Sequence, residues 1–161
     1  MRAGRVAYYG LFAALAILMG YVEMLIPVPV PIPGVKLGLA NVIIIIMMYF
    51  MDTKSAFFVS LVRVVLSGLL FAGFAGLLYS LAGAMCSFVV MALLKKTGKF
   101  SIAGVSIAGG IFHNVGQIIV AALVVQNVRM AYYLPFLLVS GVVTGLLIGI
   151  VAKTALGYLN R

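Results

Sequence analysis

Acidic residues are scarce in this 161-residue chain, which has one glutamate, Glu23, and one aspartate, Asp52. Acid/base catalysis by paired carboxylates and a magnesium site built from several carboxylates both need more acids than this. The HExxH and GxSxG motifs are also absent, and without a phosphate-binding loop the chain alone cannot use ATP to power transport. We therefore expect no catalytic residues, no bound metal and no cofactor.

Cysteine, histidine and charge of either sign are also rare. The single Cys86 can form no internal disulfide and, with one histidine, no Cys and His metal cluster. Only 8% of the residues are charged, whereas soluble domains have about a quarter. Hydrophobic residues make up 66% of the chain and the mean hydropathy is +1.32, which indicates an integral membrane protein. The long apolar runs do not alternate, so the spans are predicted to be helices rather than barrel strands.

Six spans are predicted, all in one transmembrane domain that covers residues 1–161, because each helical crossing needs about 20 apolar residues. The predicted spans are Tyr8 to Ile26, Val35 to Met51, Ser55 to Phe71, Ala75 to Leu94, Ile102 to Val125 and Tyr132 to Ala152. Proline, glycine or charge interrupts the apolar pattern between them, at "PVPVPIPG", "MDTKS", "AGFAG", "KKTGK" and "QNVRMAYY".

The basic residues predict the orientation, with both termini in the cytoplasm. One side would carry Arg2, Arg5, Lys54, Lys95, Lys96, Lys99, Lys153 and Arg161, and the other only Lys36 and Arg129. The basic residues that give the net charge of +9 lie mostly at span ends, where they can contact anionic membrane lipid. We therefore expect no nucleic acid as a partner.

Arg63 and His113 are the polar residues that stand out inside the spans. At 1.5 Å per residue they lie about 12 Å and about 18 Å from the predicted cytoplasmic face, which are comparable depths. Small or polar residues recur around them at helical spacing, and we expect these stripes to face the bundle interior. The stripes are Ser60, Arg63 and Ser67 in the third span; Ser80, Gly83, Ala84 and Ser87 in the fourth; Ser106, Gly110, His113, Asn114 and Gln117 in the fifth; and Gly141, Thr144, Gly145 and Gly149 in the sixth.

Two interpretations of these stripes remain open. Small residues allow helices to pack closely and serine or asparagine can bond across helices, which suffices for the sixth span. A mid-span guanidinium costs at least about 2.5 to 3.5 kcal/mol to insert, so Arg63 indicates a ligand or an ion pair. His113 fits either a ligand contact or a hydrogen bond to a neighbouring helix.

The segments "PIPGVKLGLANVI", "LVRVVLSGLL", "YSLAGAMCS", "GVSIAGGIFHNVGQ" and "GVVTGLLIG" closely resemble the bacterial family called heptaprenyl diphosphate synthase component I, also labelled Gx transporter. The resemblance covers nearly the whole chain. It implies a distant similarity to the six-helix substrate-binding S-components of energy-coupling factor (ECF) vitamin transporters. The characteristic positions that match are Lys36, Gly38, Asn41, Arg63, Ser67, Gly68, Ser80, Gly83, His113, Asn114 and Gln117.

The two family labels imply different functions. We favour an S-component-like binding subunit of a transporter, which captures a small anionic or vitamin-like solute and works with a transmembrane coupling subunit and ATPases. The candidate substrate-binding residues are Arg63, His113, Asn114, Gln117, Asn41, Lys36 and Ser67. Such a subunit needs only a cavity with a few convergent polar groups.

The alternative is a non-catalytic membrane accessory of a prenyl diphosphate synthase, because one aspartate cannot supply the aspartate-rich magnesium motifs of such an enzyme. A proton-coupled carrier that uses His113 and Glu23 is disfavoured, because their estimated depths differ by about half a leaflet or more. The proline-rich segment Pro27 to Gly34, followed by Lys36, is either an outer lid or a stiff connector.

The first span carries two pairs of small residues four positions apart, Gly10 with Ala14 and Ala16 with Gly20. Such pairs let another helix approach closely. We expect this face to bind either another span or the coupling subunit.

Overall fold

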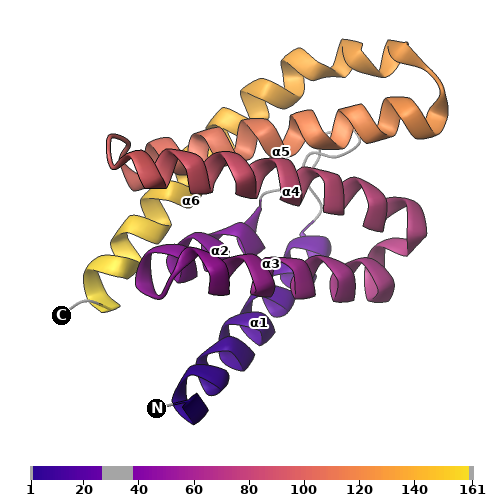
Figure 1. Ribbon diagram of the computed structural model, residues 1–161. Coiled ribbons are helices and arrows are strands. Elements are labelled where there is room, and N and C mark those ends of the chain that lie inside the picture. Colours follow the sequence, from indigo (N-terminus) through magenta and orange to yellow (C-terminus); the bar gives the residue numbers. More distant parts are fainter. Residues whose placement is uncertain (1, 27–37, 160–161) are drawn as a thin grey trace.

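A computed structural model describes residues 2–26 and 38–159, and every regular element in these ranges is helical. The elements are α1 (Arg2–Leu25), α2 (Leu39–Phe50), α3 (Thr53–Ser67), the π-helical turn η1 (Gly68–Ala72), α4 (Gly73–Thr97), α5 (Ile102–Val125), the 3-10 helix η2 (Val128–Tyr133) and α6 (Leu134–Leu159). Figure 1 shows a bundle of helices with the first turn of α1 and the last turn of α6 toward the same side as the α4–α5 turn.

Five of the six predicted spans are helices long and apolar enough to cross a membrane, and this is compatible with a multi-pass membrane protein. The predicted second span is different. Its described helix, α2, has 12 residues and is about 18 Å long, whereas the hydrocarbon core is about 30 Å thick. Residues 35–37 of that prediction lie outside the described ranges. A count of six crossings is therefore not confirmed.

Helix α2 is apolar because it forms the protein core. Its residues Ala40, Ile44, Ile45, Ile46, Met47 and Met48 are all buried. A helix that is hydrophobic on every side is buried in protein or in lipid, and hydropathy does not distinguish the two. Here the neighbouring helices α1, α3 and α6 contact α2 and account for its burial.

Local sequence signals mark where the helices begin and end. Asp52 caps α3, where its carboxylate accepts a hydrogen bond from the Ser55 backbone N–H at 2.8 Å, as expected for an N-cap. Ser101 caps α5 in the same way through the Gly104 N–H at 3.1 Å. The predicted break at "AGFAG" is confirmed at Gly73, whose φ of 68° lies in the left-handed region that glycine adopts without strain.

The helices form a closed ring around the centre of the bundle. In order, α1 contacts α3, α3 contacts α4, α4 contacts α5, α5 contacts α6, α6 contacts α2, and α2 contacts α1. Figure 1 shows α4, α5 and α6 together on one side, with α1, α2 and α3 on the other. Residues that are distant in sequence therefore face one another across a shared interior.

Helices α5 and α6 approach most closely through glycines. A Cβ added to Gly141 would lie 2.8 Å from the carbonyl oxygen of Gly110, and one added to Gly145 would lie 2.7 Å from Cα of Ile107. One added to Gly149 would lie 2.6 Å from Cα of Ala103. Close packing by small residues thus accounts for the glycine stripe of the sixth span, as the sequence predicted.

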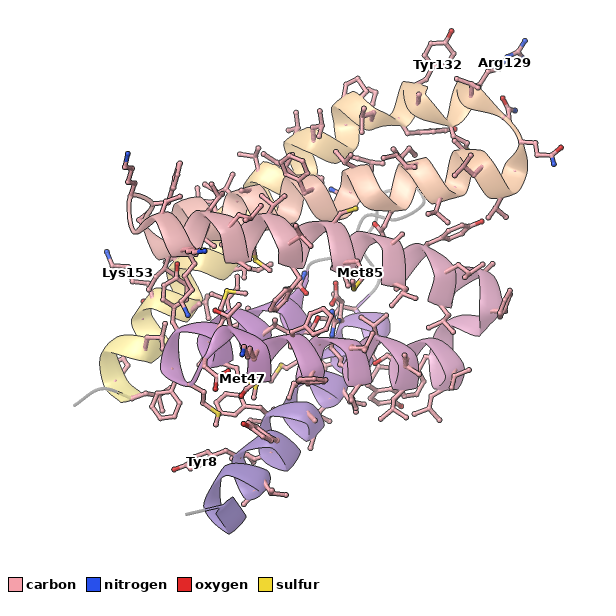
Figure 2. The ribbon with its side chains drawn as sticks, viewed as in Figure 1. Tyr8, Met47, Met85, Arg129, Tyr132 and Lys153 are labelled. Carbon is pink, nitrogen blue, oxygen red and sulfur yellow. The ribbon has the colours of Figure 1, made fainter. Side chains whose placement is uncertain are left out.

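Most of the described lysine side chains lie at one end of the bundle. Lys54 begins α3, Lys95 and Lys96 end α4, and Lys153 lies near the end of α6. Figure 2 shows Lys153 and Arg129 at opposite ends of the protein. This separation agrees with the charge asymmetry of the sequence, while the identity of the cytoplasmic side remains a prediction.

Candidate functional site

A small polar cavity lies inside the ring. Residues from all six α-helices line it, together with Gly38, the N-cap of α2. The lining comprises Glu23, Gly38, Asn41, Ile45, Arg63, Ser80, Ser87, Met91, Ser106, Gly109, Gly110, His113, Asn114, Thr144 and Ile148. Its volume is about 60 Å³. Since a cavity of about 150 Å³ holds benzene, this one has room for a few water molecules or a carboxylate-sized group.

Arg63 is the only arginine or lysine among the described residues of that lining. Its Nη2 donates a hydrogen bond to Oδ1 of Asn41 at 3.2 Å, which joins α3 to the first turn of α2. Its Nε is buried and has no hydrogen-bond partner within the described residues. A buried charged donor without a partner is unfavourable, so an acceptor placed beside this guanidinium would be stabilising.

Glu23 interacts electrostatically with Arg63 from the end of α1. Its Oε1 accepts a hydrogen bond from the backbone N–H of Gly38 at 2.6 Å. Gly38 caps α2 with a φ of 77°, in the left-handed region that suits glycine. The carboxylate thus fixes the start of α2 beside Arg63 and partly neutralises the guanidinium.

The position of Glu23 corrects the depth estimate made from the sequence. Counting residues from the start of each span placed Glu23 and His113 about half a leaflet or more apart in depth, yet both line one cavity together with Arg63. The estimate failed because residue counts measure distance along a helix axis and take no account of helix tilt or of short elements such as α2. Depth therefore no longer separates Glu23 from His113.

Helix α5 supplies several of the neutral polar groups of the cavity. Nδ2 of Asn114 donates a hydrogen bond to the backbone carbonyl of Leu137 in α6. Oγ of Ser106 is buried and has no partner within the described part of the chain. His113 lines the cavity from the same helix face. These groups can accept or donate hydrogen bonds to a bound group but carry no fixed charge of their own when the imidazole is neutral.

The structure brings together four of the seven predicted binding residues, namely Arg63, His113, Asn114 and Asn41, in the lining of this cavity. Gln117 instead lines a neighbouring apolar pocket. Ser67 has a buried Oγ without a partner in the described ranges and is not among the residues that line the cavity. Lys36 and the segment Pro27 to Gly34 lie outside the described residues.

The sequence prediction of binding residues missed Glu23, Ser80, Ser87, Ser106 and Thr144, which also line the cavity. The four hydroxyl residues belong to the predicted inward stripes, so helical spacing could have found them. Glu23 had no such signal, because only the packing of α1 against α2 brings it inside. Among the described residues, no group of three or more His, Cys, Asp or Glu side chains is placed to hold a metal ion.

The small residues of α1 have two different environments. Ala16 is fully buried, and a Cβ on Gly20 would meet Oγ of Ser67 at 3.8 Å and Cβ of Ala40 at 3.9 Å, so this pair packs inside the chain. Gly10 and Ala14 are exposed. Gly10 also lines an open groove of about 970 Å³ between α1 and α3. Only this second pair remains available to a partner.

These features describe a helical membrane protein with a central polar cavity and, among the described residues, no cluster of acidic side chains in its lining. The chain matches the family described as heptaprenyl diphosphate synthase component I over residues 12–155, and it belongs to that family. It shows no significant match to a curated protein or to a solved structure.

Proposed function

We propose that the chain is a non-catalytic membrane component of a prenyl diphosphate synthase, resident in the bacterial cytoplasmic membrane. Membership of the component I family supports this proposal, since a first component implies a second subunit. The carboxylates of the chain support it too. Asp52 caps α3 through Ser55 while Glu23 lines the cavity, so the two acids serve different parts of the fold. A partner subunit would supply the magnesium-binding aspartates.

The observation that carries the role of the cavity is the buried Nε of Arg63, which has no protein partner in the described structure. We infer that Arg63 binds a small anionic group, such as a carboxylate or one phosphate group of a larger ligand. The volume of about 60 Å³ admits a carboxylate directly. A phosphate group requires a small movement of the lining, for which the flexible side chain of Met91 is well suited.

Copurification tests the proposed partner. The tagged chain is extracted from its native membranes in mild detergent, and the recovered proteins are identified by mass spectrometry. The proposal predicts recovery of a soluble prenyl synthase, whose rate or product length changes when the chain is added. Failure to recover a synthase, together with unchanged products of the isolated enzyme, would count against the proposal.

A second candidate function is an S-component-like, solute-binding subunit of a transporter that works with a coupling subunit and ATPases. The central cavity, lined by residues of all six α-helices, favours it. The volume argues against it in this conformation, because cavities for vitamin-sized ligands measure about 300–1,000 Å³. Equilibrium dialysis against flavins, other vitamins and isoprenoid phosphates separates the two functions. Saturable binding of a vitamin, with no synthase recovered, would favour the transporter.

A further inference from the structure

A second pocket lies between α4, α5, η2 and the start of α6, at the end of the bundle where α4 begins and α5 ends. Its lining comprises Gly76, Tyr79, Ser80, Gln117, Ile118, Ala121, Val125, Met130, Tyr133 and Leu137. Its volume is about 320 Å³. By the benzene comparison, this is room for a molecule of roughly a dozen non-hydrogen atoms. The lining, as far as the structure describes it, has no charged side chain.

This pocket is separate from the polar cavity but adjoins it. Ser80 lines both. Between them, Nδ2 of Asn114, a cavity residue, donates to the carbonyl of Leu137, a pocket residue. The inner end of the apolar pocket therefore meets the polar layer of the bundle, whereas Val125 and Tyr133, which are exposed, lie at its other end. A ligand can enter at that exposed end.

Gln117 gives this pocket its polar recognition group. The side chain is only 6% exposed, and its Oε1 is buried without a hydrogen-bond partner among the described residues. Its position is fixed by close packing, since a Cβ added to Gly83 would lie 2.8 Å from Cγ of Gln117. A buried amide oxygen without a partner is unfavourable, and a donor in the ligand would satisfy it.

We propose that the pocket binds a medium-chain, uncharged alcohol. Its alkyl chain would lie against the apolar lining, and its hydroxyl would form a hydrogen bond with the Gln117 amide. An anionic head group is disfavoured because no cation lies among the described lining residues. A hydroxyl both donates and accepts, so it suits the amide whether Oε1 or Nε2 faces the ligand. This site is distinct from the anion site at Arg63 and stands independently of it.

Photolabelling tests this site. The full chain is reconstituted in phosphatidylcholine nanodiscs and labelled with a decanol that carries a diazirine on its chain, and the labelled peptides are mapped by mass spectrometry. The expected result is saturable labelling of residues in α4, α5 and η2. Unlabelled 1-decanol should displace the probe about tenfold better than decane at equal membrane concentration, because decane has no hydroxyl.

Three variants identify the contacts. Gln117→Leu replaces the amide with an apolar side chain and should make decanol and decane equal competitors. Ala121→Phe fills the pocket and should abolish saturable labelling. Leu123→Phe is the matched control, since Leu123 lies on the same helix, is 70% exposed and does not line the pocket, so labelling should persist. If Ala121→Phe does not fold, the smaller substitution Ala121→Leu replaces it. Saturable labelling of that variant should fall at least severalfold.

The outcomes separate recognition from simple filling by lipid. Labelling that never saturates, or that spreads along the lipid-exposed faces of all helices, would overturn the site. Equal displacement by decane and decanol in the unmodified chain would overturn hydroxyl recognition and leave a pocket filled by bilayer chains. Undiminished labelling of a folded Ala121 variant would place the probe elsewhere and also refute the proposal.

Discussion

Arg63 donates a hydrogen bond to Asn41 at 3.2 Å and interacts electrostatically with Glu23 across the same cavity. Helices α1, α2 and α3 are thereby linked inside the bundle by polar and charged groups that line one cavity. Because Nε of Arg63 has no partner in the described structure, the linkage leaves a donor for a bound group.

Neutralising Glu23 should strengthen anion binding. Glu23→Gln keeps an oxygen that can accept the Gly38 N–H and removes the negative charge that competes for Arg63. We expect the affinity for inorganic phosphate to rise about tenfold, which corresponds to about 1.4 kcal/mol. Isothermal titration on the detergent-purified protein measures this. An unchanged or weaker affinity would show that the bound anion and Glu23 do not share Arg63.

Removing Arg63 should destabilise the fold through Glu23. Arg63→Ala removes the hydrogen bond to Asn41 and leaves the Glu23 carboxylate without its nearby cation, so we expect the free energy of unfolding to fall by about 1–3 kcal/mol. The double variant Arg63→Ala with Glu23→Gln should recover much of the loss, because no uncompensated charge remains. Thermal unfolding of the two single variants and the double variant gives the coupling free energy between Arg63 and Glu23. Strictly additive effects would indicate that the two residues do not stabilise each other.

Close packing of α5 on α6 should make Gly141 intolerant of even a methyl group. Gly141→Ala places a Cβ 2.8 Å from the carbonyl of Gly110, and we expect a loss of about 1–3 kcal/mol by overpacking. Gly157 in the same helix is a matched control, since nothing lies within 4 Å of its added Cβ. Gly157→Ala should be neutral or stabilising by up to about 1 kcal/mol. Thermal unfolding that ranks the two variants equally would contradict the packing described.

The exposed pair on α1 should affect assembly and not folding. Leucine at Gly10 and Ala14 should reduce copurification of a partner subunit severalfold and leave thermal stability within about 0.5 kcal/mol, as for most surface substitutions. Ala16→Leu is the contrasting variant, because Ala16 is fully buried and an added side chain would overpack the core. Full recovery of the partner with both leucines present would exclude this face as the interface.

Much of the fold is readable from local sequence signals. The bounds of α5 are those that the sequence predicts, because Ser101 caps its start and the apolar run ends at Gln126. The inward stripe of α5 is also confirmed, with Ser106, Asn114 and Gln117 all buried. Helical periodicity by itself is enough to place these residues on one face of the helix.

The remaining features depend on tertiary packing. Hydropathy alone reads α2 as a membrane span, because a core helix and a lipid-facing helix have the same apolar composition. The presence of Glu23 in the Arg63 cavity depends on how α1 packs on α2, which no local pattern encodes. The division of Asn114 and Gln117 between a polar cavity and an apolar pocket likewise depends on the positions of α4 and α6.

The most direct test of the proposed role of the cavity is equilibrium binding of inorganic phosphate to the purified chain and to Arg63→Gln combined with Glu23→Gln, a pair that leaves no unpaired charge in the cavity. The account predicts saturable binding by the unmodified chain and at least a tenfold loss in the double variant, which should remain folded by thermal unfolding. Equal binding by the two proteins, or no saturable binding by the unmodified chain, would contradict an anion site at Arg63.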